Sequence, residues 1–277
     1  MNKELAVIML QYNSSDLTED LLRSAERFES EAIKDYRWIL MDNDSRNDRF
    51  EYFSSKFPWV ELVKYDVNLG FAKAHNRVME TIREPWVLLL NNDCILQNNA
   101  ITLTLRSAKQ YGADFATCCV LNSDFTHQNN HSTLPTPLRR VFINTTGMAR
   151  LISSIRRRLP ASRVGYINGA FLLLKKDSIP RPSLFNERFF FYMEDLDLIF
   201  RLSKEHRVGY RFSAGRVVHL GGGSAKRSLD EQQIRNMKGE QNVIGIWKEY
   251  FPLWQSVLAE KVLFYTRWIR LKMRNNE

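Results

Sequence analysis

The chain has 277 residues, of which 44% are hydrophobic and 26% are charged. This composition excludes fibrous and disordered classes, and the length allows one large α/β domain with appendages. The formal net charge of +9 indicates an anionic partner, for which a nucleotide diphosphate, an acidic membrane surface and nucleic acid are alternatives.

The cysteines and the apolar runs predict a cellular location. Cys118 and Cys119 are adjacent in an apolar run, so the three cysteines form neither a disulfide framework nor a metal-binding pattern. We therefore expect a reducing, cytoplasmic compartment. The apolar segment 5–10 is too short for a signal sequence and is predicted to be a strand. No run approaches the ~18 apolar residues of a membrane span, so membrane association is predicted to be at most peripheral.

The first half of the chain alternates strands with helices. Strands are predicted at residues 5–10, 38–41, 60–65 and 86–90, and helices at residues 17–28 and from residue 71 to about residue 82. This order is typical of a parallel sheet with helices on both faces, in which ligands bind beyond the carboxyl ends of the strands. Two of the strands run directly into carboxylates, Asp42 and Asp93, so these two are expected to share one crevice.

The second half is less regular and ends in helices. Strands are predicted at 115–121, 208–213 and 217–220, an apolar run spans 164–174, a surface loop covers 122–137, and residues 229–273 are predicted to be helical. We divide the chain into a domain of residues 1–225 and a helical extension of residues 226–277. Within the domain, residues 1–120 are expected to bind nucleotide and residues 121–225 to supply the acceptor and catalytic half.

Two segments combine arginines with large apolar residues. Residues 139–163 carry seven arginines among leucines and isoleucines, and the last helices mix tryptophan, tyrosine and phenylalanine with basic residues. Each segment fits a membrane interface. A solvated helix face for the first, and a helix packed on the domain for the second, are equally good interpretations. His127 and His131 have the spacing of a helical metal pair, but their polar and proline-containing surroundings favour a loop.

An aromatic run meets three carboxylates at residues 189–202. The aromatic side chains can exclude water, and a carboxylate beside them gains basicity suited to a general base. Helical spacing pairs Asp197 with Arg201, which leaves Glu194 and Asp195 in the first turn to face a cleft. The alternative is that all three acids only favour the helix N-terminus through its dipole.

A divalent cation is predicted at Asp93, because neither a P-loop nor a G-x-G-x-x-G motif is present to hold a diphosphate. Asp93 follows two asparagines and would anchor the ion. His219, at the end of a strand and before a glycine turn, is a candidate second ligand for a Mn²⁺-type ion, or else a structural histidine.

Six motifs in order resemble family 2 glycosyltransferases of the GT-A fold, in particular the bacterial rhamnosyltransferase-type branch. They cover about residues 5–225 and are Tyr12-Asn13, Leu40 to Ser45, Asn68 to Phe71 with Asn76, Leu90 to Asp93, Phe185 to Asp197, and His219 with Ser224. The resemblance implies a Rossmann-like, mostly parallel sheet and an inverting transfer of a sugar from a nucleoside diphosphate to an acceptor hydroxyl. The sequence departs from the family's pattern at Asn91-Asn92-Asp93, where many GT-A enzymes have two acids.

The resemblance also implies roles for single residues. Asp42 would accept a hydrogen bond from the N3–H of uracil or thymine, Asp93 and His219 would hold Mg²⁺ or Mn²⁺ on the diphosphate, and Asp195 would take the proton of the acceptor hydroxyl. Glu194 is the second candidate for this catalytic base, and its favoured role is to orient the acceptor or the loop. The remaining residues expected to line the nucleotide-sugar site are Tyr12, Asn13, Asn68, Gly70, Asn76 and Asn92.

The implied partners are a dTDP-rhamnose or UDP-sugar donor and a glycan or lipid-linked acceptor at the inner face of the plasma membrane, with anionic lipid rather than nucleic acid as the charged partner. A sugar-1-phosphate nucleotidyltransferase is an alternative, although the glycine-rich basic loop expected after its first strand is absent from residues 11–16. A catalytically silent module that binds lipid or nucleic acid is the third hypothesis.

Overall fold

The computed structural model of the protein describes residues 3–46, 49–146, 148–190, 193–221 and 243–274. Ser224, the aromatic residues at 191 and 192, and residues 229–242 of the expected C-terminal helices therefore lie outside the described residues. Of the predicted basic and aromatic side chains, those at 150, 157 and 267–274 also lie outside the description.

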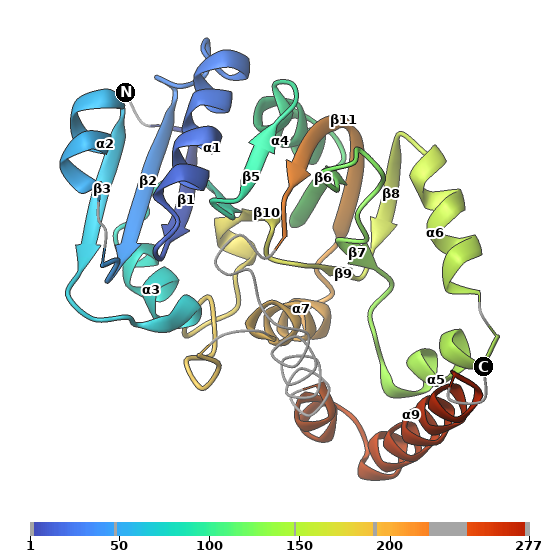
Figure 1. The fold of residues 1–277 in the computed structure, drawn as a ribbon. Helices are drawn as coiled ribbons and strands as arrows, with labels where there is room; N and C mark the ends of the chain where they lie inside the picture. Colours follow the sequence, from blue (N-terminus) through green and yellow to red (C-terminus); the bar gives the residue numbers. More distant parts are fainter. Residues whose placement is uncertain (1–2, 47–48, 147, 191–192, 222–242, 275–277) are drawn as a thin grey trace.

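A nine-stranded sheet forms the centre of the molecule, in the order β3-β2-β1-β4-β10-β6-β11-β5, with β8 paired to β11 (Figure 1). The strands are β1 (Leu5–Gln11), β2 (Tyr36–Asn43), β3 (Val60–Tyr65), β4 (Trp86–Leu90), β5 (Cys94–Leu96), β6 (Phe115–Leu121), β8 (Ala161–Val164), β10 (Phe171–Lys175) and β11 (Gly209–His219). A separate antiparallel pair joins β7 (His131–Ser132) to β9 (Tyr166–Ile167).

Strand directions gather distant residues at one edge. Strands β1 to β4 are mutually parallel, and β10 runs antiparallel to both β4 and β6, so β6 and its parallel neighbour β11 point the same way as β4. The ends of β1, β2, β4, β6 and β11 therefore lie at the same edge, which we call the carboxyl edge. Strand β10 begins there, with Phe171 opposite Leu90. The mostly parallel α/β sheet expected from the sequence is confirmed.

Helices cover both faces of the sheet. They are α1 (Ser15–Phe28), α2 (Phe50–Lys56), α3 (Gly70–Met79), α4 (Ala100–Gln110), α5 (Pro137–Thr146), α6 (Ala149–Arg158), α7 (Glu194–Lys204) and α9 (Leu253–Arg274). Alternate residues of β1 show the two cores: Leu5 and Val7 pack with α1, α2 and α4, whereas Ala6 and Ile8 pack with α3 and α7. Such strands are continuously apolar because both faces are buried, and each fully buried aliphatic side chain contributes about 1.5–3 kcal/mol.

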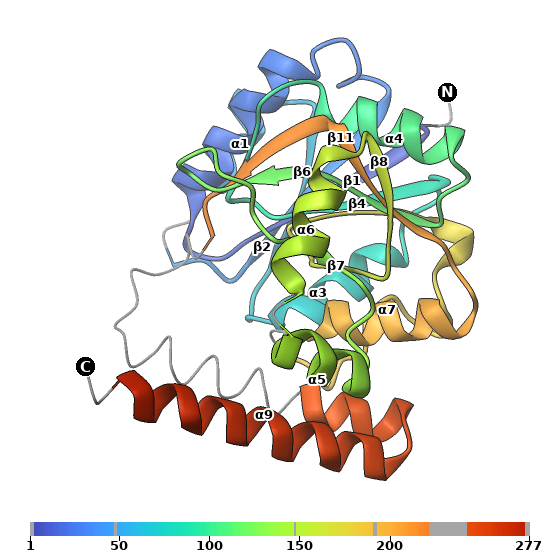
Figure 2. The same cartoon turned by 90° about the vertical axis from the view of Figure 1, so that its right-hand side faces the viewer.

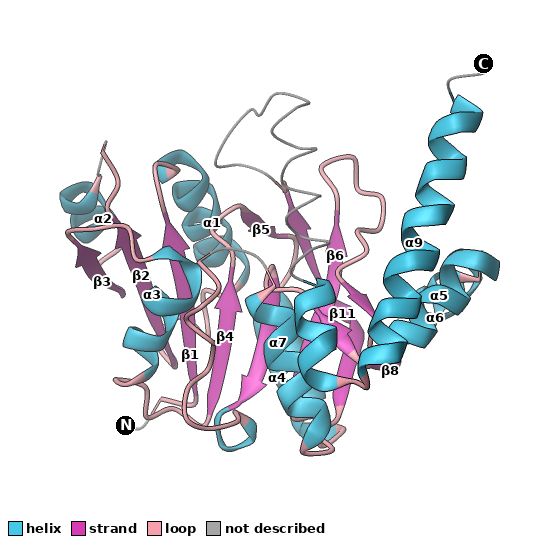
Figure 3. Cartoon of the chain, turned by 90° about the horizontal axis from the view of Figure 1, so that it is seen from below, coloured by secondary structure: helices cyan, strands magenta, loops and turns pink. Residues whose placement is uncertain are grey.

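The C-terminal helical extension packs partly on this domain. Residues 243–250 are helical, and the buried Trp247 indole donates a hydrogen bond to the Pro135 carbonyl at 2.7 Å. The Tyr250 ring stacks on Phe200 of α7, with ring centroids 5.2 Å apart. Helix α9 then lies along α5, as Figures 2 and 3 show from two sides. Among the described helices, none is both long and apolar enough to cross a bilayer.

Four local predictions need correction. The expected strands 208–213 and 217–220 are one strand, β11, with a register shift between Arg211 and Arg216. Gly215 lies within this shift, and it allows β11 to approach α4 closely, because a Cβ there would lie 2.8 Å from the Ala100 carbonyl oxygen. The second strand extends through Asn43, so Asp42 lies inside β2 rather than after it. The 164–174 run is divided between β9 and β10, and the 122–137 loop contains β7.

Gly70 brings the start of α3 against the segment that precedes α7. Its φ is +74°, a left-handed conformation that glycine adopts without steric cost. A Cβ at Gly70 would lie 2.6 Å from the Phe190 carbonyl oxygen, and the next amide, that of Phe71, donates to this same oxygen at 2.9 Å. The backbone at residue 190 is thereby fixed to α3.

We expect Gly70→Ala to destabilise the protein by more than the ~1–2 kcal/mol of a left-handed conformation alone, since the new Cβ would clash with the Phe190 carbonyl. Gly112→Ala is the matched control, because Gly112 has a φ of +62° and nothing within 4 Å of a Cβ. Free energies of unfolding from urea denaturation provide the comparison. Equal losses in the two variants would contradict the close contact.

Candidate functional site

The ends of β1 and β2 present a buried amide and a buried carboxylate. Gln11 and Asp42 are neighbours in register, and the Gln11 amide nitrogen donates to Asp42 Oδ2 at 2.6 Å. The Ser45 N–H donates to Asp42 Oδ1 at 2.8 Å. Gln11 Oε1 is buried without a hydrogen-bond partner among the described groups, so a hydrogen-bond donor is missing there. Gln11 was not predicted as a site residue; the signal that could have found it is a polar residue at the end of an apolar strand.

Asparagines connect the loops at this edge. Asn13 has a φ of +52°, its N–H donates to Ser45 Oγ at 2.9 Å, and its Oδ1 accepts from the Arg46 N–H at 2.8 Å. Tyr12 beside it is 38% exposed, which leaves its ring accessible. Asn92 lies beyond β4 and donates to Ser14 Oγ at 2.7 Å. The loop after β1 is thus held to the loops after β2 and β4.

Two further predicted residues connect α3 to its surroundings. The Asn68 side-chain oxygen accepts from Asn43 Nδ2 at 3.0 Å and from the Gly70 N–H at 2.9 Å. Asn76 exchanges two hydrogen bonds of 2.9 Å with the Phe185 backbone and also donates to Glu187 at 3.0 Å. Asn76 therefore fixes the segment that leads to α7, and these partners already occupy its amide nitrogen and oxygen.

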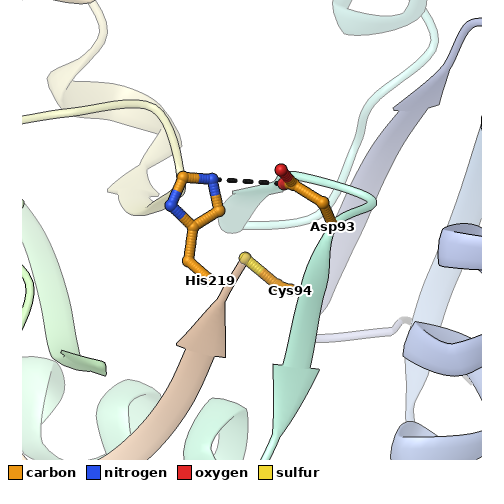
Figure 4. Close-up of side chains that lie close together, drawn as sticks. All are labelled: Asp93, Cys94 and His219. Carbon is orange, nitrogen blue, oxygen red and sulfur yellow. Dashed lines mark ion pairs between the residues drawn. The ribbon is translucent and has the colours of Figure 1, made fainter. Parts of the chain in front are cut away.

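Asp93 and His219 meet at the carboxyl edge, where β4 and β11 end (Figure 4). His219 Nε2 lies 3.1 Å from Asp93 Oδ1, and its Nδ1 lies 2.7 Å from Gln128 Oε1. The amide nitrogen of Gln128 donates to the His219 carbonyl, which fixes the amide orientation. Nδ1 must therefore carry a proton, and a neutral His219 directs the lone pair of Nε2 toward the Asp93 carboxylate.

A positive centre between these two groups would satisfy both. Either a proton on Nε2 or a divalent cation meets this need, and a carboxylate with an imidazole suits Mn²⁺ or Mg²⁺. Gln128 supplies the outer hydrogen bond that orients a metal-bound histidine. Gln128 was not predicted as a site residue, because it lies in a polar loop 91 residues from His219.

Cys94 completes the one group of three potential metal ligands found among the described residues, with Asp93 and His219. Burial raises the pKa of its thiol well above the usual value, and the charge of Asp93 adds to this. The Cys94 thiol faces the Ala170 carbonyl at 3.4 Å. A protonated thiol is a poor ligand for a hard cation, so the site fits an ion held by Asp93 and His219.

Asp195 is the most strongly hydrogen-bonded acid of the first turn of α7. Its Oδ2 accepts from the Tyr166 hydroxyl at 3.0 Å and from the Gly169 N–H at 3.2 Å, and its Oδ1 accepts from the Leu196 N–H at 2.7 Å. Burial raises the pKa of Asp195, whereas the three donors oppose that rise. Tyr166 was not foreseen, since it lies 29 residues from Asp195 on a two-residue strand.

Glu194 differs from its neighbour in being almost without partners. It is buried, and its Oε2 makes no hydrogen bond among the described groups. Burial, followed by the charge of Asp195, raises the pKa of Glu194 to about 8. The preceding residue, Met193, has a φ of +77°, so α7 begins from a strained backbone. A pKa of about 8 means that the Glu194 carboxyl keeps its proton at neutral pH.

Asp93 and Asp195 are brought near each other through Ala170. The Ala170 carbonyl accepts from the Asn91 N–H at 3.0 Å, in the turn that carries Asp93, while the adjacent Gly169 binds Asp195. Asp42 lies at the same edge, two strands from β4. Asp197 instead pairs with Arg201 at 3.0 Å, which confirms the predicted ion pair, and accepts from Tyr250 at 3.1 Å.

Comparison with known proteins decides the family. The sequence model of glycosyl transferase family 2 matches residues 6–179, more than half of the chain. The chain belongs to glycosyl transferase family 2. This glycosyltransferase is 23% identical over 243 residues to N-acetylglucosaminyl-diphospho-decaprenol L-rhamnosyltransferase from two Mycobacterium tuberculosis strains, CDC 1551 / Oshkosh and H37Rv. Each match covers 79% of this chain and 76% of the relative.

Solved glycosyltransferase structures share the fold. GalNAc-T7 with UDP, GalNAc and Mn²⁺ has a TM-score of 0.58 at 10% identity, over 79% of this chain and 44% of that one. TarS from S. aureus has a TM-score of 0.57 at 13% identity, over 78% of this chain and 36% of TarS. The glycosyltransferase thus spans less than half of either structure. The predicted GT-A fold is confirmed, and family membership favours glycosyl transfer over the nucleotidyltransferase alternative.

Replacing Glu194 with Gln should change how the stability of the glycosyltransferase depends on pH. Between the ordinary glutamate pKa of 4.5 and the folded value of about 8, the unfolded chain has lost a proton that the folded chain keeps. Wild-type stability relative to Glu194→Gln should therefore fall as pH rises through this window, by up to about 1.4 kcal/mol per pH unit. Urea denaturation at several pH values measures this difference, and parallel stability curves for the two proteins would contradict the raised pKa.

Proposed function

We propose that the protein is an inverting glycosyltransferase that moves a sugar from a nucleoside diphosphate to a hydroxyl of a glycan or lipid-linked acceptor. The observation that carries the proposal is the junction at Gly169-Ala170, where one residue holds Asp195 and the next holds the turn of Asp93. A base and a diphosphate-side carboxylate are thereby available at one edge. An in-line displacement needs these two groups on opposite sides of the anomeric carbon.

In the proposed reaction, Asp195 accepts the proton of the acceptor hydroxyl as that oxygen forms a bond to the anomeric carbon. The bond between the anomeric carbon and the diphosphate oxygen breaks, and the configuration inverts because there is one displacement. Tyr166 and the Gly169 N–H orient the Asp195 carboxylate. Glu194, buried and protonated, keeps a second negative charge away from the base.

Asp93 and His219 would hold a Mg²⁺ or Mn²⁺ ion, with Gln128 orienting the imidazole. When bound, such an ion neutralises the negative charge that accumulates on a departing diphosphate. Asp42 would accept the N3–H of a uracil or thymine base, supported by Gln11 and Ser45. Tyr12, Asn13, Asn68, Gly70 and Asn92 are proposed to shape the same donor site.

The donor that we favour is dTDP-rhamnose, with UDP-hexoses second. The support is the activity of the relatives, which are rhamnosyltransferases named for a diphospho-decaprenol saccharide. By the same argument, a lipid-linked saccharide in cell-surface polysaccharide synthesis is the favoured acceptor, reached from the inner face of the plasma membrane. The division into a nucleotide-binding half and an acceptor half remains part of this proposal, and both halves contribute strands to the one sheet.

Asp195→Asn should lower the turnover number by about 10²–10⁴-fold while leaving the dissociation constant of the nucleotide sugar nearly unchanged. The reason is that a general base acts on the acceptor in the transition state and does not hold the donor. Initial rates and donor calorimetry on the same preparation separate the two quantities. A loss of donor affinity equal to the loss of rate would assign Asp195 to donor binding instead.

Asp93→Ala should abolish the binding of Mn²⁺ as measured by calorimetry. Gln128→Leu should weaken the Mn²⁺ affinity by roughly 10–100-fold, because His219 loses its orienting hydrogen bond. Asn122→Ala is the control: Asn122 accepts from the other end of the Gln128 amide, at 3.0 Å, without contacting His219. It should retain nearly wild-type Mn²⁺ affinity. Unchanged Mn²⁺ binding in Asp93→Ala would remove this residue from the metal site.

A further inference from the structure

Helices α5, α6 and α9 lie toward one end of the molecule, and α9 lies along α5 (Figures 1 to 3). Large apolar side chains of these helices are exposed. We call the exposed apolar residues of these helices and their flanks the apolar end surface; they are Leu138, Phe142, Met148, Leu151, Ile155, Leu159, Leu253, Trp254, Leu258, Phe264 and Tyr265. Trp254 is 60% exposed and Phe264 is 73% exposed. Exposed apolar surface of this extent marks an interaction site.

The exposed residues follow helical periodicity. Each helix presents a pair at positions i and i+4: Leu138 with Phe142, Leu151 with Ile155, and Trp254 with Leu258. The opposite side of α9 is used inside the protein, where Ser256 and Ala259 are fully buried. Helix α9 therefore buries one face against the domain and presents a second apolar face to the outside.

The helices that carry this surface are rich in positive charge. In the sequence, α5 and α6 together contain six arginines and no acidic residue, and α9 has Glu260 as its one acid against five basic residues. Arg139 and Arg156 lie close enough that burial, and then the charge of Arg139, lower the pKa of the Arg156 guanidinium. Crowded cations beside apolar residues are complementary to an anionic bilayer, which offers both phosphate and hydrocarbon.

We propose that the apolar end surface docks on an anionic phospholipid membrane. A second copy of this chain is the weaker candidate, because a two-fold interface would bring the same arginines face to face. Membrane docking would place Trp254, Leu258 and Phe264 in the interfacial layer, with the arginines at the phosphates.

This proposal rests on the proposed function, because membrane docking would bring a lipid-linked acceptor to the proposed base, Asp195. Arg140 of α5 is near enough to Tyr166 to act on its phenol: burial raises the pKa of Tyr166 well above its usual value, and Arg140 opposes this. Tyr166 in turn donates to Asp195. Val141 and Tyr166 also share one apolar cluster with Leu196 of α7 and Trp247, so the docking surface and the acceptor side are continuous.

The test uses the full chain with vesicles of phosphatidylcholine alone or mixed with phosphatidylglycerol. Wild type should co-sediment with the anionic vesicles only. It should co-sediment less at high salt, because the electrostatic screening length falls to about 3 Å at 1 M salt. Trp254→Ser with Leu258→Ser should lower the partition coefficient at least about tenfold. Arg139→Gln with Arg158→Gln should lower it about fivefold for each removed cation. Phe125→Ser, which replaces a side chain 64% exposed on another part of the protein, should bind as wild type.

The outcomes separate this proposal from the proposed function. Vesicle binding by the Trp254 and Leu258 double variant equal to wild type, or a wild-type dimer in light scattering that this variant dissociates, would overturn membrane docking. Sugar transfer to a short acceptor without lipid should be unchanged in the double variant, which also verifies folding. Absence of that transfer in wild type, together with intact vesicle binding, would refute the proposed reaction and leave the docking surface supported.

Discussion

The hydrogen bond from the Asn91 N–H to the Ala170 carbonyl joins the two parts of the site. It ties the end of β4 to the start of β10, the strand that reverses direction in an otherwise parallel region of the sheet. Because β10 begins where its neighbours end, the turn before it occupies the carboxyl edge and can hold groups from α7. A parallel strand at this position would have sent Gly169 to the other edge, and Asp195 would have lost one of its donors.

Much of the fold follows from local sequence, because the strands are buried on both faces and read as unbroken apolar runs. Asp42 and Asp93 were found for the same reason, as carboxylates at the ends of such runs. Gln11, Gln128 and Tyr166 were missed, because their importance depends on partners between 29 and 91 residues away. Pairings of that range depend on strand order and direction, which apolar periodicity does not specify.

The C-terminal segment shows why two interpretations of one pattern were equally good. A helix that packs on a domain and a helix that meets a membrane both need aromatic residues, so composition cannot separate them. In the structure, Trp247 is buried against the domain whereas Trp254 is 60% exposed. Aromatic residues a few turns apart in the same segment thus lie in different environments, one inside the protein and one in solvent, and only their packing distinguishes them.

The burial of Glu194 affects the charge balance around the proposed base, Asp195. Two ionised carboxylates in adjacent positions of α7 would face an incoming sugar diphosphate with doubled repulsion, in a region where low polarity strengthens every charge. Because Glu194 keeps its proton at neutral pH, it adds no negative charge beside Asp195 at the amino-terminal end of α7. In the proposed reaction, the burial of one carboxyl group therefore lowers the repulsion that the negative charge of the donor would meet.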